Sequence, residues 1–537
     1  MDDIALSRRR LLAGAALALP CSRLGQAAEL SGPLTPAERE QRAFERRCDA
    51  ARAALQSTLP PLATNGDENR YPDRRASFVK TLPQNDLGEV DPEAYRQWLA
   101  ILASGDSARF ATAPRDPQAF ERLNNPQATY AIDLVGADAA ALSLAPPPSF
   151  ASPNMAAEMA ELYWLALMRD VPFRDYELHP LATAAIADLH AVGLGQFTTA
   201  TLFRGTATGE HRGPRVSQFL WRDLPFGLKT IEQRYRVPSV GQSFVTTFGA
   251  WLACQRGARS HDELRFDGDP RYIASYRELV EYVHRDFSFQ AFMNAALIIL
   301  HMGDDAVLSP TNPYRGSKTE FGDITFGNKN ILALLAAASQ LAQKTAYYYK
   351  WQVHRRARPE LVGGRIEAQL SGRRSYDLHS ALLECEGLAR VKLTFGTSLL
   401  PQAYPEGCPT HPSYPAAHAV NAGSCATVLK AFFDESYIIP DALEATRDGT
   451  RLEPWGANEL TLGGEINKLA ANIALARDAA GVHFRSDSIE GLKLGEQVAI
   501  NFLADSSRTY NERFDGFVLT LIDGSRIRIS NGSAYPD

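Results

Sequence analysis

Apolar residues recur at three- and four-residue spacing through the long middle of this 537-residue chain. That spacing places apolar side chains on one face of an α-helix, so the pattern predicts amphipathic helices that pack together. Alternating strand patterns are scarce in the same region. We therefore expect an all-α fold, with its helices best marked at 155–167, 272–283, 289–300, 331–349 and 374–393.

The C-terminal end differs from the rest of the chain. Residues 514–529 contain two β-prone stretches separated by Asp523-Gly524. Asp-Gly between such stretches is typical of a tight hairpin turn. We expect a small β-hairpin at about 514–529.

The domain organisation follows from composition and from the N-terminus. No Gly/Ser-rich linker or fixed-period repeat interrupts the chain after about residue 60, so we expect one helical domain at 61–537, preceded by a polar extension at 29–60. Arg8, Arg9 and Arg10 precede a short apolar run, 11–19, which resembles a twin-arginine export signal. Residues 1–28 are predicted to be a signal peptide, and the mature protein to be periplasmic or secreted.

Charge and cysteine content narrow the possible partners. The formal net charge is −6 and no basic block occurs, so we expect no nucleic acid partner, and small solutes instead. The apolar run at 11–19 is shorter than the roughly 20 residues that span a bilayer, so no membrane association is expected after signal cleavage. Two interpretations stay open for Cys408 and Cys425: a disulfide in an oxidising compartment, or two buried thiols.

The first of three basic segments is 350–359. In a continuous helix Lys350 and Arg358 lie within about 80° of each other and can face one pocket, with Pro359 marking the end of that helix. An ammonium and a forked guanidinium suit an oxyanion. The alternative is a solvated helix face.

The second segment is 411–421, where Pro412 and Pro415 predict a loop before a new helix. The backbone N–H groups of Ala417 and His418 would then lie at a helix N-terminus, which favours an anion. His418 is a candidate acid/base, and a purely structural histidine is the alternative.

The third segment is 472–487. Arg477 and His483 would point about 120° apart in an unbroken helix, so a break is expected, and Gly481 can supply it as the residue that follows a helix end. Asp487 has two possible roles there, as a cap of the next helix or as a hydrogen-bond partner of a histidine.

Together these segments resemble the vanadium-dependent haloperoxidases, specifically the bromoperoxidase branch, and more distantly the phosphatidic acid phosphatase type 2 superfamily. The shared pattern is Lys-x7-Arg-Pro, then Pro-Ser-Gly-His, then Arg-x5-His. The resemblance covers roughly residues 60 to 535 and includes the flanks Asn-Gly-Asp-Glu at 65–68, Glu-Leu-Tyr-Trp at 161–164, Tyr-Val-His-Arg-Asp-Phe at 282–287 and Gly-Glu-Ile-Asn-Lys-Leu-Ala-Ala-Asn at 464–472.

The resemblance implies a fold of two four-helix bundles and one vanadate per subunit. His483 would be the axial ligand, and the vanadate oxygens would be bound by Lys350, Arg358, Arg477 and the Ala417 N–H. His418 would be the acid/base. Lys350 would also polarise bound peroxide, and His411 occupies the place associated with bromide-preferring members. A homo-oligomer is implied as well.

The implied reaction oxidises a halide, with bromide and iodide favoured, by hydrogen peroxide to a hypohalite equivalent that reaches a small organic acceptor. The departure from the family is Ala416-Ala417 in place of Ser-Gly. Loss of the hydroxyl is expected to weaken transition-state support by about 1 to 3 kcal/mol, and a Cβ at 417 could obstruct the anion or oppose a positive φ. Two alternatives remain: an acid phosphatase in which His483 is the nucleophile, or a non-redox anion-binding or rearrangement enzyme.

Overall fold

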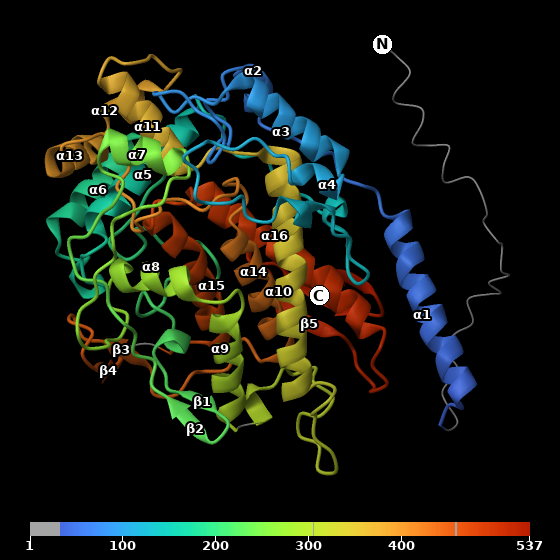
Figure 1. Ribbon diagram of the computed structural model, residues 1–537. Coiled ribbons are helices and arrows are strands. Elements are labelled where there is room, and N and C mark those ends of the chain that lie inside the picture. The colour runs from blue at the N-terminus through green and yellow to red at the C-terminus, as the bar shows by residue number, and fades with distance from the viewer. Residues whose placement is uncertain (1–32, 304, 457–458) are drawn as a thin grey trace. The chain divides into compact units, whose positions relative to one another are not determined.

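The computed structural model describes residues 33–303, 305–456 and 459–537. The predicted signal peptide, residues 1–28, lies outside the described residues. The described chain is mainly helical, and its strands form three small antiparallel sheets (Figure 1).

The elements of the described chain have the following bounds. The helices are α1 (Pro36–Gln56), α2 (Asp67–Arg70), α3 (Pro92–Ser104), α4 (Ser107–Phe110), α5 (Pro153–Met168), α6 (Pro180–Ala191), α7 (Phe248–Gln255), α8 (Tyr276–Arg285), α9 (Gln290–His301), α10 (Asn328–Tyr348), α11 (Pro359–Leu370), α12 (Ser380–Glu384), α13 (Glu386–Phe395), α14 (Ala417–Phe432), α15 (Leu462–Ala479) and α16 (Arg485–Ser507). The strands are β1 (Leu224–Phe226), β2 (Lys229–Ile231), β3 (Leu443–Ala445), β4 (Leu452–Pro454), β5 (Phe517–Thr520), β6 (Arg526–Ser530) and β7 (Ser533–Pro536).

One four-helix bundle consists of α10, α14, α15 and α16. Its central helix, α14, is rich in Ala and Gly, and every side chain of α14 except that of His418 is buried. Glycine lets α14 and α16 approach closely: a Cβ at Gly423 would lie 2.1 Å from the Leu492 carbonyl oxygen, and one at Gly495 would lie 1.9 Å from the Val420 carbonyl oxygen. Small residues thus bring these two helices close together.

The second bundle packs α5, α6, α12 and α13 against one another. The predicted single helix at 374–393 is wrong, because the chain breaks at Cys385 into α12 and α13. Asp188 of α6 explains the break: its carboxylate accepts the N–H groups of Glu386 and Gly387, at 3.0 and 2.9 Å, and so starts a new helix there.

The other sequence predictions agree better with the structure. Segments 155–167, 289–300 and 331–349 correspond to α5, α9 and α10. Segment 272–283 becomes helical only at Tyr276, because Ser275 and Glu278 form a capping box. The C-terminal hairpin is present as β5 and β6, with Phe517 opposite Ile529, and a third, exposed strand that the sequence did not predict, β7, pairs with β6.

The chain divides into two compact units, residues 1–51 and 52–537. The boundary falls within α1, which forms most of the predicted polar extension and has no buried residue. Across the described ranges, no helix combines the length and apolar character needed to cross a membrane.

The cysteines settle the open question about a disulfide. Cys408 and Cys425 are both buried free thiols. The Cys425 Sγ lies 3.2 Å from the Asn421 side-chain oxygen on its own helix, α14, whereas the Cys408 Sγ lies 3.6 Å from the Gln402 side-chain oxygen. The buried-thiol interpretation is therefore confirmed.

Candidate anion-binding site

Side chains from all three basic segments meet at one end of the first bundle. Lys350, Arg358, His411, Arg477 and His483 are all buried, although they come from three separate segments of the chain. We call this group the cationic pocket. A helix-end cluster of this kind is where an anion is most readily held.

Arg358 is the hub of the cationic pocket. Its Nε donates to the His411 carbonyl at 2.9 Å, and its Nη1 donates to the Val482 carbonyl at 2.8 Å. The same guanidinium contacts both imidazoles: Nη1 lies 2.9 Å from His483 Nε2, and Nη2 lies 3.1 Å from His411 Nδ1. Burial and the nearby Arg477 lower the pKa of Arg358 to about 10.

The backbone between Lys350 and Arg358 is not the continuous helix that the sequence predicts. After α10 the chain makes a π-helical turn, Tyr349–His354, and then Arg355 adopts a left-handed φ of 41°. Pro359 begins α11 instead of ending a helix, because proline is well suited to the first helical position. Lys350 and Arg358 still converge, but through this reversal rather than from successive turns of one helix.

Lys350 reaches the pocket as a fully buried ammonium. Its Nζ donates to the carbonyls of Pro412 and Ser413, at 2.7 and 2.8 Å, which fixes the proline-rich loop. These two bonds use two of the three N–H donors. Burial, reinforced by repulsion from Arg358 and Arg477, lowers the pKa of Lys350 well below its usual value.

The proline-rich loop leads into α14 as predicted. Ala416 is the N-cap residue, and no side chain caps the helix, so the first N–H groups of α14 remain free of a capping side chain. Of the two conflicts considered at Ala417, the backbone conflict does not arise, because its φ is not positive. Ala417 instead belongs to a cluster of buried apolar residues with Tyr349, Tyr414 and Val420. The backbone here accepts a β-carbon.

His483 lies in the joint between α15 and α16. Gly481, with φ of 82°, provides the predicted break. The His483 Nδ1 lies 2.9 Å from Asp487 Oδ2, and the same oxygen accepts the Phe484 N–H at 3.1 Å. Asp487 therefore has both roles that the sequence left open, cap and histidine partner. It holds the proton on Nδ1 and leaves the Nε2 lone pair facing the pocket.

The pKa values of both pocket histidines reflect their surroundings. Burial, followed by repulsion from Arg358 and Lys350, lowers the pKa of His483 well below its usual range. Burial and the same two cations lower the pKa of His411 in the same direction. Both imidazoles are therefore neutral near pH 7, which is the form that can ligate a metal.

His418 lies at the rim of the pocket, in the first turn of α14. Its side chain is 29% exposed, and its Nε2 lies 3.2 Å from the buried Oδ1 of Asp286, the residue that ends α8. A carboxylate in this position orients the ring.

Arg477 enters from the last turn of α15. Its Nη1 donates to the Val283 carbonyl and to the Tyr404 hydroxyl, both at 3.2 Å, while its Nε is buried without a hydrogen-bond partner. Within the part of the chain that the structure describes, no carboxylate forms an ion pair with Lys350, Arg358 or Arg477. The cationic pocket therefore carries charge that the protein itself leaves unbalanced.

Known proteins resemble the chain over almost its whole length. A family model described as the VCPO second helical-bundle domain matches residues 395–512. A vanadium-dependent bromoperoxidase of Ascophyllum nodosum is 34% identical over 94% of each chain, and one of Corallina officinalis is 31% identical over 91% of this chain and 98% of its own. The chain belongs to the vanadium-dependent haloperoxidase family.

A solved structure agrees with this family. The second vanadate-dependent bromoperoxidase of Ascophyllum nodosum, a homohexamer, superposes on this haloperoxidase with a TM-score of 0.89 and 26% identity over 98% of both chains. The predicted all-α fold with two helix bundles is confirmed.

The residues of the haloperoxidase pocket fit vanadate. The unpartnered Nε of Arg477 and the unbalanced charge of Lys350 and Arg358 call for an anion rather than a cation. The neutral Nε2 of His483 is the one pocket nitrogen oriented by a carboxylate on its far side. Oxyanion oxygens and a metal centre would satisfy both sets of groups.

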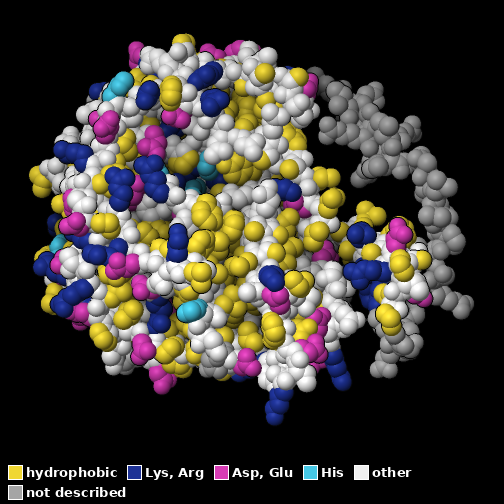
Figure 2. Space-filling model, turned by 60° about the horizontal axis from the view of Figure 1, so that its bottom comes forward, with side chains coloured by type: hydrophobic (Ala, Val, Ile, Leu, Met, Phe, Trp, Pro, Cys, Tyr) yellow, Lys and Arg dark blue, Asp and Glu magenta, His cyan; other side chains and the backbone are white. Residues whose placement is uncertain are grey.

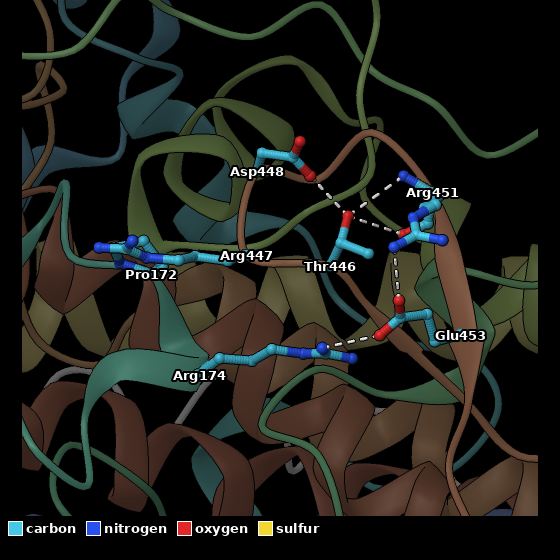
Figure 3. Close-up of a pocket in the computed structure, with 7 residues that line it drawn as sticks. All are labelled: Pro172, Arg174, Thr446, Arg447, Asp448, Arg451 and Glu453. Carbon is cyan, nitrogen blue, oxygen red and sulfur yellow. Dashed lines mark hydrogen bonds and ion pairs between the residues drawn. The ribbon is translucent and has the colours of Figure 1, made fainter.

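A separate surface pocket of the haloperoxidase lies elsewhere. It has a volume of about 590 Å³ and lies beside β3 and β4. Figure 3 shows that Arg174 and Arg451 both contact Glu453, and that Thr446 binds Asp448. The third arginine of this pocket, Arg447, pairs with Asp175, so all three arginines have a carboxylate partner, unlike the cations of the cationic pocket.

Several residues of the site were not singled out from the sequence. The ring centroids of Tyr347 and His411 lie 5.4 Å apart. Tyr347 could have been predicted from the sequence, because residues three apart on a helix lie on the same face and Tyr347 precedes Lys350 by three. Asp286 and Tyr404 gave no such signal, because each meets its partner only through the tertiary fold.

Proposed function

We propose that this haloperoxidase binds one vanadate per subunit in the cationic pocket and oxidises halide with hydrogen peroxide to a hypohalite equivalent. The observation that carries the proposal is the unbalanced cationic pocket around His483, whose Nε2 lies 2.9 Å from Arg358 Nη1 and has no carboxylate partner in the described residues. When bound, vanadate supplies the Lewis-acid centre that activates peroxide toward halide.

The side chains of the cationic pocket would have different roles in binding vanadate. His483 would ligate vanadium through Nε2, because Asp487 holds its other nitrogen. Lys350, Arg358 and Arg477 would hold the vanadate oxygens by charge-assisted hydrogen bonds, together with the Ala417 N–H at the start of α14. Lys350 and its neighbours would also stabilise the charge that develops on oxygen during turnover.

His418 would move protons at the pocket rim. Its imidazole reaches solvent on one side and the Asp286 carboxylate on the other, so Nε2 can hold a proton and exchange it with water. Asp286 would orient the ring.

His411 would influence which halide is oxidised, with bromide and iodide favoured. It lies between the Arg358 guanidinium and the Tyr347 ring, which together form a cationic and polarisable wall. The names of the relatives, bromoperoxidases, support the same preference. The small organic acceptor would react with the released oxidant.

Ala416 would reduce activity relative to a serine at this position, because the N-cap position offers no hydroxyl to the anion. The N-terminal sequence supports export by the twin-arginine route to the periplasm or the medium.

A homo-oligomer is proposed from the homohexameric relative. Exposed apolar side chains support it: Ile132 is 72% and Leu134 is 93% exposed, and Asp133 between them pairs with Lys344 of α10. In Figure 2, hydrophobic side chains gather along the middle of the visible face. Leu134→Glu should lower the molar mass measured by light scattering, whereas Leu178→Glu, at a site that is 89% exposed, should leave it unchanged.

One assay tests the activity. Purified protein is loaded with orthovanadate, and bromination of a phenolic dye by peroxide is compared with phosphate-ester hydrolysis by the vanadate-free form. Bromination that requires vanadate supports the proposal. Ester hydrolysis alone would favour an acid phosphatase, and the absence of both activities would favour a non-redox anion-binding or rearrangement enzyme.

A further inference from the structure

We propose that His284 is a positioning residue that holds Arg477 in the cationic pocket through Tyr404, and that its protonation links anion affinity to pH. The inference rests on the proposed function, because it assigns Arg477 to the anion. His284 itself makes no contact with the pocket residues that would bind vanadate.

His284 is clamped between two carboxylates. Its Nδ1 lies 2.9 Å from Glu281 Oε2 on the same helix, and its Nε2 lies 2.7 Å from Glu406 Oε1. Ionised carboxylates only accept hydrogen bonds, so only the imidazolium, with a proton on each nitrogen, satisfies both contacts. Burial lowers the pKa of His284, but the bonds to Glu281 and Glu406 outweigh it and raise the pKa above its usual value.

The clamped ring stacks on Tyr404. The ring centroids lie 3.8 Å apart at an interplanar angle of 15°, which is face-to-face contact. An imidazolium over an aromatic face gains cation–π attraction. Since Tyr404 is fully buried and its hydroxyl donates to the Val280 carbonyl at 2.8 Å, its ring is held at both the face and the tip.

Tyr404 in turn fixes the position of Arg477. Its hydroxyl accepts from Arg477 Nη1 at 3.2 Å, and the guanidinium carbon lies 5.5 Å from the Tyr404 ring centroid. The second acceptor for Nη1 is the Val283 carbonyl, next to His284 in the chain. The last turn of α8 therefore positions the buried arginine through both of its contacts.

Other charges face the clamp and set its pH response. Arg285 pairs with Glu281 at 2.9 Å. Lys80 donates to the backbone carbonyl of Glu406 at 2.9 Å, and its charge helps to lower the pKa of the Glu406 carboxyl group. When His284 loses its proton at higher pH, one carboxylate loses its donor and the stack on Tyr404 weakens. Anion affinity should therefore fall as the pH rises through the raised pKa of His284.

The test compares dissociation constants of orthovanadate and of inorganic phosphate at about pH 6 and pH 8.5, using the full-length protein. His284→Ala removes both charge and stacking, His284→Phe keeps only the ring, and Arg285→Ala is the control because it also pairs with Glu281 but does not contact Tyr404. Relative to the control, His284→Ala should weaken binding about 10- to 100-fold at pH 6, by analogy with other residues that orient ligands. His284→Phe should weaken anion binding less than His284→Ala does. The change in dissociation constant between pH 6 and pH 8.5 that Arg285→Ala still shows should be smaller in His284→Phe, and the difference is the part that His284 causes.

Two results would overturn the inference. The first is a folded His284→Ala or His284→Phe variant that binds both anions within twofold of the control at both pH values. The second, which needs no variant, is an imidazole NMR titration that places the His284 pKa below about 6.5, the ordinary value. Wild-type protein that binds vanadate but does not brominate would refute the proposed activity and leave the positioning role supported. Wild-type protein that binds neither anion would refute both.

Discussion

Asp487 connects two groups of buried cations that differ in what balances their charge. On one side, Arg356 donates to Asp487 at 2.7 Å and to Glu158 at 3.1 Å, and Arg485 forms an ion pair with Glu161. On the other side, Lys350 and Arg358 form no ion pair with any carboxylate in the described residues. Arg356 is as buried as Lys350 and Arg358, so pairing and not burial distinguishes these three side chains.

The protonation equilibria of the two groups follow this difference. Burial opposes charge in both, but Asp487 and Glu158 overcome it for Arg356, whose pKa is raised. Lys350 and Arg358 have lowered pKa values because burial is joined by repulsion, from Arg358 and Arg477 for Lys350 and from Arg477 for Arg358. Loss of one partner from the paired group would leave a buried charge uncompensated, whereas the unpaired group already holds a repulsion that an anion would relieve.

The largest effect on activity is expected for His483, which Asp487 connects to the paired group. His483→Ala removes the nitrogen that Asp487 orients, and vanadate-dependent bromination should fall at least ~1000-fold, or roughly 4 kcal/mol in activation free energy. The measurement is the bromination rate at saturating orthovanadate. An unchanged rate would show that His483 is not the ligand.

Within the paired group, Arg356→Met should cause the largest loss in the free energy of unfolding. This variant leaves Asp487 and Glu158 buried without their guanidinium partner, which typically costs about 3–5 kcal/mol. Urea unfolding of the vanadate-free protein measures the loss. A cost under ~1 kcal/mol would mean that the pairing does not stabilise the fold.

Activity at the unpaired group should rise in Ala416→Ser. The new hydroxyl can hydrogen-bond the anion or cap α14, and it should improve turnover by about 1–3 kcal/mol in activation free energy. Ala417→Gly is the matched control: it restores the other family residue without adding a hydroxyl, and should give no gain because the φ of Ala417 is not positive. A gain in the control alone would contradict this account.

The smallest effect on stability is expected for Lys350→Met. The variant loses two hydrogen bonds to the proline-rich loop, but it also removes a buried charge and its repulsion with Arg358. These contributions offset each other, so the cost in urea unfolding should be about 1 kcal/mol or less. A loss as large as that of Arg356→Met would remove the contrast between the groups.

The sequence predicts those parts of the site that local chemistry determines. The start of α14 after Pro412 and Pro415 and the break at Gly481 follow from backbone constraints within a few residues, and both are confirmed. The helix through 350–358 was predicted wrongly, because periodicity alone cannot detect a π-helical turn followed by a left-handed residue.

The rest of the site depends on contacts between distant segments. His418 meets Asp286 across 132 residues, and Arg477 meets Tyr404 across 73. The sequence also does not distinguish Arg356, which has carboxylate partners, from Arg358, which has none, because both lie in the same basic run. Only the packing of α5 and α16 against that run supplies carboxylates to one and not the other.

Thermal unfolding of the vanadate-free protein, titrated with orthovanadate and with inorganic phosphate, tests the unbalanced pocket most directly. We predict that both oxyanions raise the unfolding midpoint of the wild type, with a stabilisation of about 2.7 kcal/mol at a hundred times the dissociation constant. The shift should disappear in Arg358→Met, which removes the hub of the pocket. A wild-type midpoint that neither oxyanion moves, or an equal shift in Arg358→Met, would contradict the account.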